Sequence, residues 1–480
     1  MTAVAAGRLP PGPRGRPLLG NALELQRDIL ANLMEGWREH GDVVRFKVPG
    51  FAIYLLAHPD HVKHVLQDRH RNYPKIPFVD NKFKRISGEG LLTSAGEFWL
   101  RQRRLSQPAF HRQRIEAFAT LMTDTTAQLL ERWARPAADG AVVDLRVEMM
   151  RLSLDVMSQA LFSADLSRDA DVIGNAVSVE FEHTHKRLNA LVDLPLRVPV
   201  PSNRRFLRSR SALDAIVYPL ITQRRRSEED HGDFLSMLMA VRDEETGAAM
   251  TDLQVRDEIM TFIFAGHETV STGLTWVWYL LSKHPAVWRR LRAEVDDSLD
   301  GRVPTVADLP RLEYTSAVIH EALRLYPPIW LIARTPLEDD EVGGYHVPAG
   351  TFVFCPPYVV QRHPGFWDNP EGFDPGRFAP ERAAGRHRYA FFPFGGGPRK
   401  CIGDYFGLME MQLVVAMIAQ RYRLDLVPGH RVVPQPVVSL RVRDGLPMTL
   451  TPVPRRHADS APDAAADAGT APARQVEGGL

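Results

Sequence analysis

The stretch FFPFGGGPRKCIGDYFGLMEMQL, residues 391–413, places one of the two cysteines of the chain directly after a run of glycines. The glycines at 395–397 let the backbone approach closely, so that amide N–H groups can point at the Cys401 sulfur. A helix is expected to begin near Ile402, and the positive end of its dipole would lower the pKa of the thiol. The loop therefore looks built around one sulfur atom.

Several kinds of site compete for Cys401. A buried structural thiol would not need the glycines, and a phosphate loop requires Ser or Thr after Lys400. A nucleophilic cysteine would need a histidine partner, and with 17 histidines in the chain this alternative stays open. A zinc site would need further cysteines, and only Cys355 remains. A thiolate ligand to haem iron explains the glycines and the helix start together. In such a site Phe394 would exclude water from the sulfur, and Arg399 would be placed to bind a haem propionate.

The loop matches the pattern F-x-x-G-x-R-x-C-x-G at Phe394, Gly397, Arg399, Cys401 and Gly403. It resembles the haem-binding loop of the cytochrome P450 family, which often also has Glu at the position of Glu410. Gly407 departs from the usual Ala, and we expect looser helix packing there without an effect on the ligand. The resemblance extends over most of residues 10–452. It implies a mainly α fold with a small β portion in one large domain, heme b as the cofactor, and Cys401 as the iron ligand.

The segment GEFWLRQRRLSQPAF, residues 96–110, matches the W-x-x-x-R helix of the family at Trp99 and Arg103. An indole N–H and a guanidinium can together hold one haem propionate. Arg334, in LIART, resembles the residue that holds the other propionate. Arg101 and Arg104 are expected on a solvated helix face.

The segment HEALRLYPP, residues 320–328, has Glu321 and Arg324 three residues apart on one helix face. Such a pair is by itself most often a surface ion pair worth about 0.2–0.5 kcal/mol. Arg377, in FDPGRF, resembles the third partner that the family has at this point. The resemblance therefore implies a buried network that fixes the segment before the haem loop.

The segment FIFAGHETVSTG, residues 262–273, resembles the oxygen-activating part of the long central helix of the family. Ala265 and Gly266 are expected to leave room above the iron. Thr269 can turn its hydroxyl towards that groove instead of back to its helix carbonyl, and Glu268 can relay protons as a general acid. The alternative is a kinked core helix in which Glu268 and Thr269 are incidental.

Composition is that of a soluble globular protein, with 59 Lys and Arg against 58 Asp and Glu, which argues against a general nucleic-acid binder. Two cysteines cannot form a disulfide framework, which suits a reducing cytoplasm. The Pro- and Gly-rich start has no apolar region of a signal peptide or membrane anchor. Residues 262–281 are long enough to span a membrane, but His267 and Glu268 interrupt them and favour a buried helix.

Periodicity predicts a mainly helical chain after an early hairpin over 43–48 and 51–56. Residues 73–90 are expected to form a long loop. Short β-like pieces are expected around 329–354 and from residue 422 to 451. We expect a Pro- and Gly-rich segment at 1–20, one domain over 21–453 and a disordered tail over 454–480. The predicted helices are a short one from His58 and then 97–107, 111–134, 144–163, 170–190, 209–227, 232–241, 252–283, 312–325 and one from near 402 to about 422.

The function that the resemblance implies is a haem-thiolate monooxygenase, which inserts one atom of O2 into a C–H or C=C bond. No segment after residue 454 is expected to fold as a reductase, so electrons would come from separate proteins, a ferredoxin with its reductase or a flavodoxin-type donor. Two alternatives remain open. One is a peroxygenase or haem isomerase, and the other is a haem sensor or carrier.

A lipophilic substrate such as a fatty acid, terpenoid or steroid is expected, because the family's pocket positions are apolar and aromatic here. The alternative is that these side chains are simply core. The pocket positions are Phe78, Val79, Phe262, Ala265, Ile329, Trp330, Leu331 and Val438.

Overall fold

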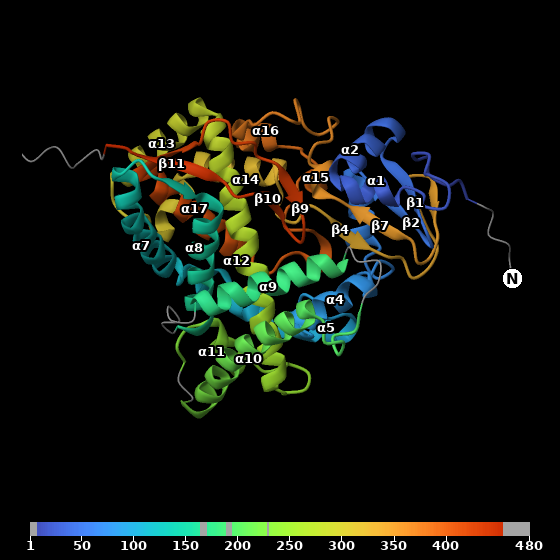
Figure 1. Cartoon of the computed structure of the whole chain (residues 1–480), viewed down its shortest axis with the longest axis horizontal. Coiled ribbons are helices and arrows are strands. Elements are labelled where there is room, and N and C mark those ends of the chain that lie inside the picture. The colour runs from blue at the N-terminus through green and yellow to red at the C-terminus, as the bar shows by residue number, and fades with distance from the viewer. Residues whose placement is uncertain (1–6, 164–169, 189–193, 228–229, 455–480) are drawn as a thin grey trace, which may run out of the picture.

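The computed structural model describes residues 7–163, 170–188, 194–227 and 230–454 (Figure 1). The predicted tail over 454–480 lies outside the described residues except for its first residue. Helices dominate, as predicted. They are α1 (Ala22–Arg27), α2 (Ile29–His40), α3 (Pro59–Lys63), α4 (Pro77–Ser87), α5 (Gly96–Ser106), α6 (Arg112–Glu116), α7 (Ala119–Ala138), α8 (Leu145–Phe162), α9 (Ala170–Leu188), α10 (Pro201–Ser227), α11 (Phe234–Ala240), α12 (Asp252–Lys283), α13 (Pro285–Leu299), α14 (Glu313–Leu325), α15 (Pro357–Val360), α16 (Pro380–Ala383) and α17 (Asp404–Arg421).

Helix α12 runs through the middle of the helical part and spans the 32 residues that its pattern predicts. The Thr251 hydroxyl accepts from the Gln254 amide while the Gln254 side chain accepts from the Thr251 amide, a capping box that defines the start of the helix. The helix ends before Pro285, which cannot continue it. Because α12 is buried along most of its length, it can carry polar groups into the centre of the molecule.

Within the described residues, short strands form four small sheets; β1, β2, β4 and β7 lie at the right of Figure 1, whereas β11 lies among the helices at the left. In the largest sheet, of order β1-β2-β7-β4, the predicted hairpin pairs Val43 with Leu56, and β2 runs parallel to β7. The strands are β1 (Val43–Val48), β2 (Phe51–Leu56), β3 (Val142–Asp144), β4 (Ile332–Arg334), β5 (Asp340–Val342), β6 (Tyr345–Val347), β7 (Phe352–Cys355), β8 (Tyr422–Leu426), β9 (Pro434–Pro436), β10 (Leu440–Val442) and β11 (Pro447–Pro452).

Three expectations about local structure were wrong or incomplete. Residues 73–90 contain helix α4, which begins at Pro77, a residue suited to the first helical turn, and buries Ile86. The predicted helix over 111–134 is broken into α6 and α7 at Ala117 and Phe118. Helices α1, α2 and α13 were not predicted, although α13 also begins with proline.

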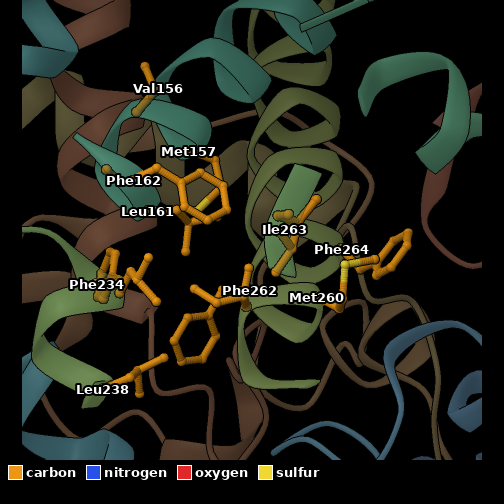
Figure 2. Close-up of a cluster of buried hydrophobic side chains, with 14 of the residues drawn as sticks. Val156, Met157, Leu161, Phe162, Phe234, Leu238, Met260, Phe262, Ile263 and Phe264 are labelled. Carbon is orange, nitrogen blue, oxygen red and sulfur yellow. The ribbon is translucent and has the colours of Figure 1, made fainter. Parts of the chain in front are cut away.

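The core lies against α12, whose residues contribute to two large clusters of buried apolar side chains. Figure 2 shows part of one cluster, in which Phe262 of α12 lies near Phe234 of α11 and Met157 of α8. Among the described residues, no helix is both long and apolar enough to cross a membrane.

Candidate active site

The loop before α17 holds Cys401 by backbone geometry. The Cys401 amide donates to the Phe394 carbonyl at 2.9 Å, which closes the loop. Gly397 has a φ of +65°, and a Cβ there would lie 1.8 Å from the Leu66 carbonyl oxygen. Only glycine fits this position, so the glycine run serves the close approach of two backbone segments.

The prediction that the loop lowers the pKa of the Cys401 thiol was wrong for the protein alone. Protein packed around the exposed Cys401 partly desolvates its thiol and raises the pKa to about 11, although a hydrogen bond with the Gly403 backbone and the charges of Arg103 and Lys400 act in the opposite direction. The first regular residue of α17 is Asp404, whose charge also raises the pKa. A metal cation bound at the sulfur would favour the thiolate, since a coordinating thiol is deprotonated.

Cys355, the other cysteine, is in a different environment. It is fully buried in β7, and burial raises the pKa of its thiol to about 12. Cys401 is accessible, whereas Cys355 is not. Cys401 is therefore the thiol that a ligand can reach.

Three cationic side chains gather near the loop with one carboxylate. Lys75, Arg334 and Arg399 lie close enough that the charges of both arginines lower the pKa of Lys75, which burial brings to about 7. Burial and the Arg334 charge lower the pKa of Arg399 to about 10. Asp80, with its Oδ1 4.0 Å from Lys75 Nζ, supplies one negative charge. The cluster keeps a surplus of positive charge in a partly buried place, which fits the two carboxylates of a haem.

Trp99 and Arg103 lie on α5 but contact different parts of the loop. The Arg399 guanidinium lies over the Trp99 ring, 4.1 Å from its centre. Arg103 Nη1 donates to the Lys400 carbonyl at 3.0 Å, and Arg103 Nε donates to the Gln107 side chain at 3.0 Å. In this arrangement Trp99 belongs with the cation cluster, while Arg103 braces the backbone next to the sulfur.

The central part of α12 differs from the expectation at two residues. The Thr269 hydroxyl donates to the Ala265 carbonyl at 2.7 Å, so it points back along the helix and not into a groove. A Cβ on Gly266 would lie 2.1 Å from the Met157 methyl group, so this glycine serves the contact with α8. Ala265 is exposed within an otherwise buried stretch and is the residue that leaves room at this face.

Glu268 is buried, and its carboxylate is held by a residue from the far end of the chain. The Ser439 hydroxyl donates to Glu268 Oε1 at 2.6 Å. Ser439 lies between β9 and β10 and is itself buried. This contact brings a carboxylate on α12 and a hydroxyl of the β portion into one site.

Glu321 lies at the centre of a fully buried ion network. Arg324 Nε donates to Glu321 Oε2 at 2.6 Å, and Arg377 Nε donates to Glu321 Oε1 at 3.2 Å. The Asp374 amide also donates to Oε1, at 2.9 Å. Arg324 further donates to the Gln361, Pro370 and Gly372 carbonyls, which lie in the segment before the loop.

The predicted pocket residues do not all line one space. Phe262 packs in the core, with its ring centre 5.1 Å from that of Phe110, and Trp330 is buried with its indole N–H bonded to the Val437 carbonyl. Both side chains are buried within apolar clusters, and their assignment to a substrate pocket stays a prediction. Phe78 is 53% exposed and carries the Lys82 ammonium over its ring. The half-buried remainder is Val79, Ile329, Leu331 and Val438.

Sequence reasoning missed Lys75 and Ser439. Lys75 lies just before α4 in YPKIP, residues 73–77, and this segment matches no motif. Ser439 lies in VVSL, residues 437–440, where a single serine between apolar residues gives no signal. The only hint for Ser439 is the Pro-Gln-Pro segment before it, residues 434–436, because such a segment favours a turn that brings the following residues against another element. Both residues acquire their partners from distant parts of the chain.

A reachable cysteine on a glycine loop, a surplus of cations beside it and a buried acid on a long central helix define a haem-thiolate protein. A sequence profile of the cytochrome P450 family matches residues 10–443, and the chain belongs to that family. Haem is therefore its cofactor, and the chain is a haem-thiolate monooxygenase.

Relatives and structures agree with this assignment. The chain is 39% identical to cyclooctatin synthase and 38% identical to cyclooctat-9-en-7-ol 5-monooxygenase, both of Streptomyces melanosporofaciens. The first match covers 92% of this chain and 95% of the relative, and the second covers 87% and 90%. The crystal structure of the cytochrome P450DA heme domain superimposes with a TM-score of 0.86 at 26% identity, over 94% of this chain and 99% of that one.

Proposed function

We propose that this monooxygenase oxidises a ring-bearing unsaturated terpenoid, with electrons from a ferredoxin and its reductase in the cytoplasm. The observation that carries the substrate class is the likeness to a relative whose name gives a cyclic alkenol as its substrate, over most of both chains. Apolar side chains at Ile329, Leu331 and Val438 support a lipophilic substrate. Two cysteines, neither in a disulfide, support a reducing compartment.

Separate groups of residues in the chain would bind the haem and transfer the proton. Cys401 would hold the iron, while Lys75, Arg334 and Arg399, with Trp99, would hold the two propionates. Haem, when bound, supplies the redox chemistry that activates O2. Phe394 would shield the sulfur, Ala265 would leave space on α12, and Glu268 would carry a proton to the reacting oxygen.

The test is a binding and turnover screen of the purified haem protein. We expect cyclic terpene alcohols and hydrocarbons to shift the haem spectrum at lower concentration than fatty acids or steroids do. With ferredoxin, its reductase and a nicotinamide cofactor, the best binder should give a product with one added oxygen from labelled O2. Product formed only with hydrogen peroxide would favour a peroxygenase, and rearranged product without added oxygen would favour an isomerase.

Thr269→Ala is expected to uncouple cofactor consumption from product formation. The Thr269 hydroxyl must turn from the Ala265 carbonyl to pass a proton, and a methyl group cannot do so. We expect the reduced cofactor to be consumed at a comparable rate, with product falling by roughly tenfold and hydrogen peroxide rising to match. The measurement is product, peroxide and cofactor in one reaction.

Thr126→Ala is the matched control for this change. Thr126 of α7 is buried and makes the same bond to the carbonyl four residues earlier, at 2.7 Å. Thr272 is unsuitable as a control, because its hydroxyl lies 3.5 Å from Ser439. Equal coupling in Thr269→Ala and Thr126→Ala would mean that Thr269 only packs the helix.

The proposed docking face for an acidic ferredoxin contains Lys400, Arg101 and Arg104. Arg104 is not a simply solvated cation, because it pairs with Asp243 at 3.3 Å and with Glu245 at 2.5 Å. Arg104→Glu would turn this region strongly acidic, and we expect slower reduction with unchanged substrate binding, an effect that salt weakens. Arg135→Glu, which removes an exposed charge in α7, is the control. If the stopped-flow rate of haem reduction changes neither with salt concentration nor with Arg104→Glu, this face is not where the ferredoxin docks.

A further inference from the structure

The buried carboxylate of Glu268 receives its hydrogen bond from a loop that lies 171 residues later in the chain. The donor is Ser439, in the short turn between β9 and β10. The next residue towards β9 is Val438, one of the half-buried apolar residues assigned to the substrate side. The acid and the substrate-side turn are therefore in direct contact.

The turn is held firmly at three backbone points. The Trp276 indole donates to the Leu440 carbonyl at 2.6 Å, and the Leu440 amide donates to the Pro328 carbonyl at 2.8 Å. The Trp330 indole donates to the Val437 carbonyl at 3.1 Å. Two large buried rings thus fix the backbone on both sides of Ser439, so its hydroxyl is presented to Glu268 with little freedom.

Glu268 also lines a small pocket, together with Thr272, Arg146 and Arg441. The free volume of this pocket is about 10 Å³, close to what one water molecule needs. Arg146 and Arg441 are half-buried, so they reach from this pocket towards solvent. A water in this pocket would lie beside both Glu268 and two half-buried arginines.

We propose that Ser439 is a positioning residue for Glu268, and that its hydroxyl holds the carboxylate between this pocket and Thr269. In this role a proton from solvent binds a Glu268 carboxylate oxygen and is then passed on towards Thr269, which returns the carboxylate to its charged form. Without the hydroxyl, the carboxylate can rotate towards the two arginines and away from Thr269. The inference rests on the proposed proton-carrying role of Glu268.

The test is a double-mutant cycle on the haem protein with Ser439→Ala and Glu268→Gln. If Ser439 acts through the acid, Ser439→Ala alone should raise the ratio of hydrogen peroxide to product by about three- to tenfold. Added to Glu268→Gln, it should change nothing further, because no carboxylate remains to be oriented. An equal effect in both backgrounds, or no effect in either, would overturn the proposal.

A second pair of variants separates the hydroxyl from the packing of the turn. Ser439→Thr and Ser439→Val have nearly the same size, so they disturb the turn equally and differ by one hydroxyl. We expect coupling near wild type in Ser439→Thr and uncoupling in Ser439→Val, even if Ser439→Ala binds haem poorly. Identical coupling in the two variants would also overturn the proposal.

A readout without turnover distinguishes this inference from the proposed function. Crystal structures of Ser439→Thr and Ser439→Val should show the Glu268 carboxylate in place in the first and rotated towards Arg146 or Arg441 in the second. An unmoved carboxylate in Ser439→Val contradicts the positioning role even if the enzyme oxidises terpenoids. Failure of every terpenoid in the screen would leave this structural comparison unaffected.

Discussion

Cys401→Ser is expected to abolish the thiolate-type haem spectrum and the monooxygenase activity together. A serine hydroxyl is a much weaker ligand than a thiolate, and the loop offers the iron no other sulfur. The reduced carbon monoxide complex should lose the red-shifted Soret band, while far-ultraviolet circular dichroism stays near that of the wild type. The measurement is the reduced carbon monoxide difference spectrum of each purified variant.

Cys355→Ser is the matched control. Cys355 is fully buried in β7 between strands β2 and β4, so its sulfur is not accessible to a ligand. It should lose some stability, about 1–3 kcal/mol for an unpaired buried hydroxyl, but keep the spectrum. A spectrum lost with Cys355→Ser and kept with Cys401→Ser would mean that the loop has been assigned wrongly.

Glu321→Ala is expected to prevent the accumulation of folded, haem-containing protein. It leaves the Arg324 and Arg377 guanidinium groups buried without their shared carboxylate. Removing one partner of a buried network costs about 3–5 kcal/mol, a large part of the stability of a typical domain. The yield of haem-bound protein and its urea unfolding curve measure the loss.

Glu371→Ala is the comparison for that variant. The Glu371 carboxylate also contacts two arginines, Arg38 and Arg362, but its side chain is 54% exposed. Arg362 is buried, but it also donates to the Tyr358 and Leu325 carbonyls and so keeps partners without Glu371. Because ion pairs of an exposed carboxylate contribute about 1 kcal/mol or less, this variant should express and bind haem normally. Similar losses for Glu321→Ala and Glu371→Ala would show that burial is not what makes the network important.

The parts of the fold that sequence predicted well are those controlled by neighbouring residues. The limits of α12 follow from the Thr251 cap and from Pro285, and the hairpin of β1 and β2 follows from two apolar runs around Pro49-Gly50. Helix α4 was missed because its charged residues and early prolines resemble a loop. Its helical form depends on packing Ile86 into the core, which local sequence does not reveal.

The residues of the cysteine loop could be anticipated from their spacing, and those of the Glu321 network from the resemblance to the cytochrome P450 family. The surroundings of those residues could not be anticipated from the sequence. Desolvation outweighs the nearby positive charges at Cys401, so the direction of its pKa shift is opposite to the one expected. The burial of Phe262 and Trp330 was likewise hidden, because the space around an aromatic ring is set by elements that meet it from elsewhere in the chain.

Local residue patterns were thus enough to single out Cys401 and the limits of α12, and the family resemblance added the acid and arginines of the buried network. These depend on residue type, on steric limits such as that at Gly397, and on periodicity over a few turns. Only the tertiary structure decided that Thr269 bonds back to Ala265, that Gly266 faces Met157, that Lys75 joins the cations, and that Ser439 holds Glu268. Each of these is a choice among side-chain partners, and partners from distant segments become neighbours only when the helices and the β portion pack together.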